Sequence, residues 1–257
     1  MPLPLLLLVD DAPELGDIVS YLGKRCGIEV ESRRDVPSAW DYLQTRRPDL
    51  LLADVNLPGL SGPELCRRVR SAPGLTDLAI ALFSHWGLPA DVAAGLEAGA
   101  DYVVSKELVS RPSELRERLL EILGPKDGRG LTPGVTWQGE GTGAAVRSDW
   151  PAALNQALRN SALRLLGPEV LRVVVRRALL HSRTPPLSEP AIAQWITTDG
   201  LVVHSPAVCA ALDSDVVARL VASLAGQTGR LLGAEASRPF REALAGVVPG
   251  LSGLLSH

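Results

Sequence analysis

Short apolar runs alternate with amphipathic stretches along the first half of the chain. The apolar runs are continuous, which is typical of strands buried on both faces of a parallel sheet. We expect strands at residues 5–9, 29–31, 50–53, 78–83 and 102–104. The stretches that follow have apolar residues at helical spacing, which predicts helices at residues 12–24, 36–46, 63–70, 89–98 and 112–123. The alternation predicts a doubly wound α/β domain at residues 1–124, with helices on both faces of a five-stranded parallel sheet.

The pattern changes after residue 124. Residues 125–149 are rich in glycine and threonine, and we expect them to form a flexible linker. Residues 150–257 are predicted to form a mostly α-helical C-terminal domain, with Pro151 in the first turn of its first helix. The chain is therefore predicted to hold two domains joined by a linker.

The helical domain contains a repeated segment. Residues 164–172 read RLLGPEVLR, and residues 230–238 read RLLGAEASR, at an offset of 66 residues. This match predicts two repeats of about 66 residues, each made of a helix, a glycine stop and a second helix, which pair as a helical bundle. Between them, residues 195–204 fit either a hairpin turning at Asp199-Gly200 or a helix end followed by an extended loop, and we favour the loop.

Composition fits a soluble protein with packed cores. The chain has 257 residues, of which 46% are hydrophobic, and this is enough for two domains. The three cysteines form no CxxC pair, which argues against a disulfide framework or a structural zinc site and favours a reducing cytoplasm. The apolar start of the chain is short and ends in two aspartates, so a strand is favoured over a signal peptide. No apolar run reaches the roughly 18 residues of a membrane span, and no membrane insertion is expected.

Charge differs between the two domains. Residues 1–125 hold 19 Asp and Glu against 13 Lys and Arg, whereas residues 151–257 hold seven against ten. Arg172, Arg176 and Arg177 form the only basic cluster of the second domain, and residues 173–175 beside them look like core. A solvated basic face is therefore favoured over a DNA-recognition helix, and nucleic acid binding is not favoured.

Polar side chains follow four of the five predicted strands. Asp10 and Asp11 follow the first strand, Asp54 the third, Ser84 the fourth and Lys106 the fifth. Taken singly, each has an ordinary explanation as a helix cap, a turn residue or a solvated lysine. In open parallel sheets, however, ligands bind outside the carboxyl ends of the strands. We therefore expect these five residues to form one site.

The residue types indicate phosphoryl transfer. Three converging carboxylates repel one another unless a hard divalent cation such as Mg²⁺ neutralises them. A carboxylate can attack phosphorus and form an acyl phosphate, while the cation and an ammonium group balance the charge of the phosphoryl oxygens. A hydroxyl group supplies a further hydrogen bond. The site is thus predicted to accept a phosphoryl group.

The motifs resemble those of response-regulator receiver domains. They are the acidic pair in LVDD, the stretch LLADVNLPGLSG that contains Asp54, the strand end at Ser84, and GADYVVSK, which ends at Lys106. The resemblance covers residues 1–124 and implies the flavodoxin- and CheY-like strand order 2-1-3-4-5.

The resemblance also implies a role for each residue of the site. Asp54 is expected to be the phosphoacceptor, and the phosphoryl donor is expected to be a sensor histidine kinase. Mg²⁺ is expected to be held by Asp10 and Asp11, with Asp11 and Asp54 as direct side-chain ligands and the backbone carbonyl of Asn56 as another. Ser84 is expected to turn towards the phosphoryl group, and Lys106 to pair with it. The chain is then a signalling protein that accepts phosphate rather than an enzyme.

Three positions depart from the family pattern. Glu107 stands where the family usually has proline. Val103 occupies the usual place of the switch aromatic. Either Tyr102, one residue earlier, serves in that role, or the coupling between Ser84 and the output face differs. His85 and Trp86 follow Ser84 where small residues are usual, and we expect Trp86 to shield the acyl phosphate from water.

The output is predicted from the second domain. We expect residues 150–257 to mediate contact with a partner protein or dimerisation, under control of phosphorylation. The alternative is a transcriptional regulator with an atypical helical DNA-binding domain. An enzymatic output is not favoured, because the sequence has no glycine-rich phosphate loop, HExxH motif or metal-spaced His/Cys group.

Overall fold

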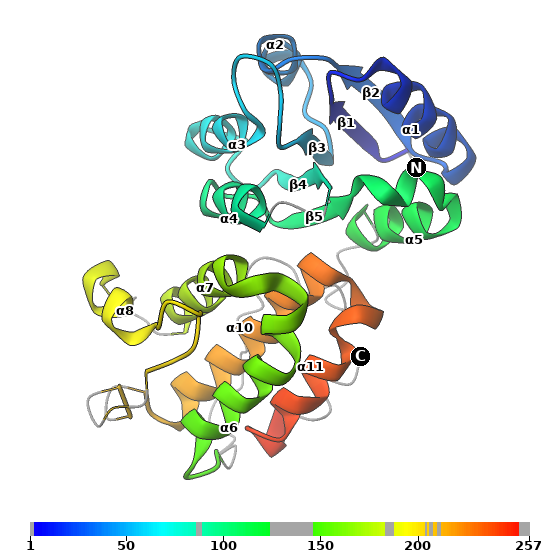
Figure 1. The fold of residues 1–257 in the computed structure, drawn as a ribbon. Helices are drawn as coiled ribbons and strands as arrows, with labels where there is room; N and C mark the ends of the chain where they lie inside the picture. The colour runs from blue at the N-terminus through cyan, green and yellow to red at the C-terminus, as the bar shows by residue number, and fades with distance from the viewer. Residues whose placement is uncertain are drawn as a thin grey trace. The chain divides into compact units, whose positions relative to one another are not determined.

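The computed structural model describes residues 3–85, 89–123, 146–182, 188–203, 205, 208–209 and 212–251 (Figure 1). The chain forms two compact units, residues 1–130 and 131–257, which are described separately below. The predicted linker falls largely outside the described residues. None of the helices described is long and apolar enough to cross a membrane. Cys26, Cys66 and Cys209 are all free thiols.

The first unit is built on a parallel sheet of five strands in the order β2-β1-β3-β4-β5. The strands are β1 (Leu5–Val9), β2 (Glu29–Arg33), β3 (Leu50–Asp54), β4 (Ala79–Ser84) and β5 (Tyr102–Ser105). Strands β1 and β3 are buried along their whole length, as their continuous apolar sequences predict. The predicted fold class and strand order are therefore confirmed.

Helices cover both faces of this sheet (Figure 1). They are α1 (Pro13–Cys26), α2 (Val36–Thr45), α3 (Gly62–Ser71), α4 (Pro89–Glu97) and α5 (Pro112–Leu123), with a short 3₁₀ helix, η1 (Lys106–Ser110), before α5. Helices α1 and α5 pack on one face, where Leu8, Leu52 and Phe83 join their apolar side chains in one core. Helices α2, α3 and α4 lie on the opposite face.

Local sequence explains where these helices begin and end. Helix α2 begins after Asp35, whose carboxylate accepts a hydrogen bond from the Ser38 N–H at 2.7 Å. At the start of α3, the Ser61 N–H donates to Glu64 Oε2 at 2.7 Å. Helix α1 ends at Gly27, which adopts the left-handed conformation that glycine tolerates best. Each boundary lies within two residues of its predicted position.

The second unit is mostly helical, as predicted. Its helical segments are α6 (Trp150–Ala157), a π-helical turn η2 (Leu158–Ala162), α7 (Leu163–His181), α8 (Glu189–Trp195), α10 (Ser214–Leu232), α11 (Ala234–Ala245) and the 3₁₀ turn η3 (Pro249–Leu251). Helix α10 packs against α7 and α11, and α11 also contacts α6 (Figure 1). The residues 173–175 that were predicted to be core are buried.

Two glycines of the predicted repeats have nearly the same backbone conformation. Gly167 has φ 75° and ψ 166° and bends α7, whereas Gly233 has φ 83° and ψ 168° and separates α10 from α11. Leucines at matching positions are fully buried in both segments: Leu154 and Leu158, Leu220 and Leu224. These features agree with the helix, glycine and helix pattern, and the duplication itself stays a prediction.

The segment after α8 differs from the favoured expectation. Instead of an extended loop, residues 196–202 form a minimal hairpin with one antiparallel bridge between Ile196 and Val202. The Thr197 N–H donates to the Leu201 carbonyl at 2.8 Å, and Gly200 adopts φ 81° in the turn. The Asn155 amide, on α6, bonds both the N–H and the carbonyl of Val202, at 3.0 and 2.8 Å. This tertiary support for the hairpin is not visible in the local sequence.

Candidate functional site

The residues predicted to form one site lie together at the carboxyl ends of the strands. Asp10 directly follows β1, Asp54 and Ser84 are the last residues of β3 and β4, and Lys106 directly follows β5. The register of the sheet places Asp54 opposite Phe83 and Ser84 opposite Ser105. Asp10, Asp54 and Ser84 are all buried, at 1%, 6% and 3% exposure.

Lys106 connects two of the carboxylates. Its Nζ lies 2.7 Å from Asp54 Oδ2 and 2.8 Å from Asp10 Oδ2. The ammonium group also lies 5.5 Å from the centre of the Phe83 ring. One cation thus bridges two carboxylates at the carboxyl ends of the neighbouring strands β1 and β3.

Burial and pairing act in opposite directions on the pKa of Asp54. Burial is the larger effect and raises the pKa, whereas hydrogen bonding and attraction to Lys106 lower it. The Asn56 N–H donates to Asp54 Oδ1 at 3.2 Å and also lowers the pKa, while the nearby charge of Asp10 raises it. The net result is a pKa above the ordinary aspartate value.

The pKa of Lys106 is also raised. Burial, the largest single effect, lowers it, but hydrogen bonds and charge attraction from Asp10 and Asp54 together outweigh burial. Lys106 is therefore held in its charged form, which is the form that can pair with an anion.

The geometry and donor types fit a divalent metal ion. Carboxylate oxygens of Asp10, Asp11 and Asp54 lie within 4.8 Å of one another. Asp10 Oδ1 accepts a hydrogen bond from the Ala12 N–H at 3.0 Å. Asp10 Oδ2 is buried and, apart from its ion pair with Lys106, receives no well-aligned hydrogen bond from the part of the chain described. An oxygen-only set with one exposed member, Asp11, matches the preference of Mg²⁺ for carboxylates plus water.

Ser84 lies at the predicted position but bonds elsewhere. Its Oγ donates to the His85 carbonyl at 3.1 Å rather than to the carboxylates.

Gly62 is a site residue whose role the sequence reasoning missed. A β-carbon at this position would lie 2.1 Å from the Asp54 carbonyl oxygen, far inside van der Waals contact. The Gly62 N–H donates to the Val55 carbonyl at 3.1 Å, which holds the start of α3 against the end of β3. The signal was the glycine that closes the LLADVNLPGLSG stretch, but only the fold reveals the close approach.

The positions that depart from the family pattern have distinct environments. The Glu107 N–H donates to Ser105 Oγ at 3.2 Å, a bond that proline cannot make. Val103 pairs with Leu82, which contacts α4, whereas Tyr102 packs on the core at α1 and α5. Neighbouring residues of a strand face opposite sides of the sheet, so the Tyr102 side chain lies on the other face from Val103, and its switch role stays a prediction. Trp86 lies outside the described residues.

Comparison with known proteins identifies relatives. A family model for the response regulator receiver domain matches residues 6–120. The chain is 37% identical over 121 residues to the phosphate regulon transcriptional regulatory protein PhoB of Rhizobium meliloti, a match that covers 45% of this chain and 53% of PhoB. It is 31% identical over 186 residues to the response regulator MprA of Mycolicibacterium vanbaalenii, covering 70% of this chain and 79% of MprA. For PhoB and several other curated relatives, the chain spans about half of their length.

A solved structure is similar to the first unit. It is the receiver domain of sensor histidine kinase PA1611 from Pseudomonas aeruginosa, with 24% identity and a TM-score of 0.44. The match covers 48% of this chain and 98% of that one, which has a magnesium ion coordinated in its active-site cleft.

Proposed function

Because the chain belongs to the response regulators, we propose that Asp54 accepts a phosphoryl group from a sensor histidine kinase, and that its phosphorylation controls residues 150–257. The observation that carries this proposal is the bridge from Lys106 to Asp10 and Asp54 at the carboxyl edge of the sheet. The protein is then a phospho-accepting signalling protein of the cytoplasm rather than an enzyme acting on a separate substrate.

The reaction is an in-line displacement at phosphorus. A carboxylate oxygen of Asp54 attacks the phosphoryl group of a phosphohistidine, the new O–P bond forms as the P–N bond breaks, and the imidazole leaves. The carboxylates of Asp10, Asp11 and Asp54 would hold Mg²⁺, together with the carbonyl of Asn56. The bound ion would neutralise charge on the phosphoryl oxygens. Lys106 already lies 2.7 Å from Asp54 and is positioned to pair with the product.

Ser84 is the residue that changes its hydrogen bond when Asp54 is phosphorylated. Its hydroxyl is bonded to the neighbouring His85 carbonyl, a weak local contact that a phosphoryl oxygen can replace. Rotation of Ser84 towards Asp54 acts on the end of β4, where Ser84 is the last residue. This movement is the step that links the phosphate to the rest of the chain.

We propose protein contact or dimerisation as the output of residues 150–257. Val173, Val174 and Val175 are buried, and α7 packs against α10. The helix that carries Arg172 is thus held within the bundle, which supports a packing role over insertion into a DNA groove.

A pull-down with the whole chain tests this output. Phosphorylated wild type is expected to capture a partner, or a second copy of itself, that the Asp54→Ala chain does not capture. Identical captured proteins and identical oligomeric states for the two chains would refute control through Asp54.

DNA binding is the second candidate. The match to MprA covers 70% of this chain, more than the receiver domain alone occupies, and PhoB is a transcriptional regulatory protein. Binding of the whole chain to random duplex DNA at increasing salt concentration distinguishes the candidates, because phosphate contacts give a steep loss of affinity with salt. Protein contact predicts no such binding.

A further inference from the structure

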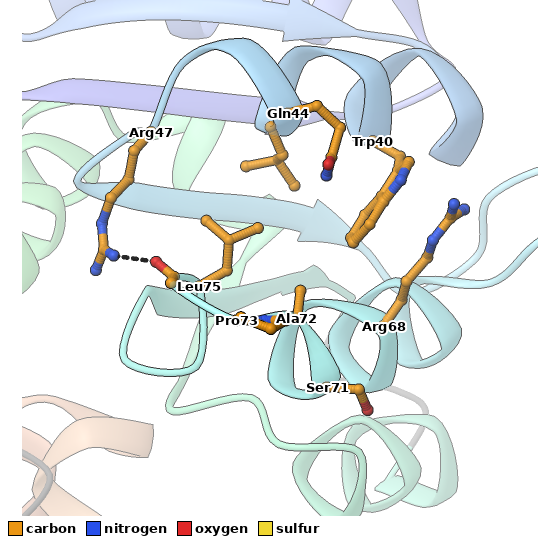
Figure 2. A pocket seen from close by; sticks show the side chains of 10 residues that line it. Trp40, Gln44, Arg47, Arg68, Ser71, Ala72, Pro73 and Leu75 are labelled. Atoms are coloured by element: carbon orange, nitrogen blue, oxygen red, sulfur yellow. Dashed lines mark hydrogen bonds between the residues drawn. The ribbon is translucent and has the colours of Figure 1, made fainter.

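A groove between α2 and α3 has features that the phosphorylation site does not use. It has a volume of about 510 Å³ and is lined by residues of the two helices and of the segment that follows α3 (Figure 2). None of the residues that line it belongs to the acidic site, and none of them carries a carboxylate. The groove is therefore unusual in a domain where acidic residues outnumber basic ones by 19 to 13.

One end of the groove presents an oriented cation. The Arg68 guanidinium lies over the Trp40 ring, with its central carbon 3.9 Å from the ring centre. Stacking fixes the plane of the guanidinium and leaves its N–H donors at the edge of that plane. Within the described residues, Arg68 forms no ion pair, and its side chain is exposed. Its donors are thus available to an incoming anion.

The other end holds a second cation. Arg47 donates to the Gly74 carbonyl, and its Nη2 lies 2.9 Å from Asp77. These two contacts anchor the Arg47 side chain at the rim, and Figure 2 shows the one to the Gly74 carbonyl. Arg47 and Arg68 lie at opposite ends of the groove in this view, with Trp40 and Leu75 between them.

The floor between the two cations is apolar. Leu43 and Leu75 are buried at 5% and 7% exposure, and the Trp40 ring and Pro73 complete the walls. A free inorganic anion does not use such a floor, and a nucleic acid backbone favours a continuous cationic track over two separated guanidinium groups. A peptide with an apolar side chain next to a carboxylate matches the apolar floor and the Arg68 guanidinium, whereas the Arg47 charge is already paired with Asp77.

We propose that the groove between α2 and α3 binds an acidic segment of a partner protein, with one apolar side chain on Leu43 and Leu75 and a carboxylate at Arg68. The proposal does not depend on phosphorylation of Asp54. It assigns this receiver a protein-binding surface separate from the phosphoacceptor.

The test uses the whole chain and a panel of short fluorescein-labelled peptides. Each peptide holds leucine, phenylalanine or tryptophan between two glutamates, and matched peptides have glutamine in place of glutamate. Fluorescence anisotropy is expected to detect binding of at least one glutamate peptide, with at least about tenfold weaker binding of its glutamine form. Arg68→Glu and the milder Arg68→Gln are expected to weaken binding by at least about tenfold.

Arg67→Glu is the matched control, because Arg67 is the neighbouring exposed arginine on α3 and does not line the groove. It is expected to leave binding within about twofold of wild type. Equal losses for Arg67→Glu and Arg68→Glu, or no binding by any peptide up to about 1 mM, would overturn the proposal. So would tighter binding of random duplex DNA than of any peptide, with the same dependence on Arg68. Unchanged thermal unfolding of the variants shows that they are folded.

Discussion

Lys106 Nζ lies 2.7 Å from Asp54 Oδ2, although the two residues are 52 positions apart in the sequence. The sheet produces this contact, because β3 and β5 end at the same edge on either side of β4. The same ammonium group pairs with Asp10, so one cation is shared by two buried carboxylates. The site therefore has an excess of negative charge that a divalent cation can neutralise.

Removal of Lys106 is expected to destabilise the first unit. Lys106→Met leaves Asp10 and Asp54 buried without their cation, which lowers the free energy of unfolding by about 1–3 kcal/mol. Urea denaturation in EDTA measures this loss. Added Mg²⁺ is expected to restore part of it by supplying charge to the same carboxylates. The control is Lys24→Met, an exposed lysine on α1; if Lys24→Met costs as much, the bridge has no special role.

Mg²⁺ binding is expected to require Asp11. Its carboxylate is the exposed member of the acidic cluster, so Asp11→Asn removes a ligand without leaving a buried charge unpaired. Titration calorimetry with MgCl₂ is expected to show at least about tenfold weaker binding for Asp11→Asn. Asp17→Asn, an exposed carboxylate on α1, is expected to bind like wild type. Unchanged affinity in Asp11→Asn contradicts the assignment.

The raised pKa of Asp54 predicts a pH-dependent effect of Asp54→Asn. The folded state holds the proton of Asp54 more tightly than the unfolded state, whose pKa is about 3.9. Stability from this group is therefore present at low pH and is lost as pH rises through the folded pKa. Asp54→Asn, which stays neutral, is expected to raise the free energy of unfolding at neutral pH in EDTA.

That gain is expected to shrink as pH falls through the folded pKa of Asp54, because the wild-type carboxyl then becomes protonated itself. Urea denaturation at a series of pH values measures it. Asp41→Asn, an exposed position on α2, is the control. A gain for Asp54→Asn that does not change with pH would contradict the sign of the pKa shift.

Gly62→Ala is expected to damage the site through the backbone. The added methyl group meets the Asp54 carbonyl oxygen at 2.1 Å, so β3 and α3 must move apart. Such overpacking costs about 1–3 kcal/mol of stability, and it displaces Asp54 from Lys106. The expected result is a lower unfolding midpoint and slower phosphorylation, measured on the same preparation. Wild-type values for both would show that the close approach is not needed.

The sequence predicted the first unit well because its signals are local. Continuous apolar runs in β1 and β3 allow no exposed face. Asp35 marks a helix start through its side-chain cap, and Gly27 marks a helix end through its left-handed backbone. The site followed from one topological rule, since the ends of parallel strands converge.

Two features that the sequence reasoning did not favour or did not identify, a hairpin and the role of a glycine, depend on tertiary contacts. The hairpin at residues 196–202 rests on Asn155, which is 47 positions away from Val202. The role of Gly62 rests on the approach of two segments. Trp40, on α2, is only partly buried and lines a groove. Helical spacing alone does not distinguish a core aromatic from one at a groove wall.

Phosphate incorporation tests the central claim most directly. The whole chain is incubated with acetyl phosphate and Mg²⁺ or with a phosphorylated histidine kinase, and mass spectrometry counts and locates the phosphoryl groups. We predict one phosphoryl group, on Asp54, and none on Asp54→Asn or in EDTA. Equal incorporation into wild type and Asp54→Asn, or a phosphoryl group on another residue, would contradict the account.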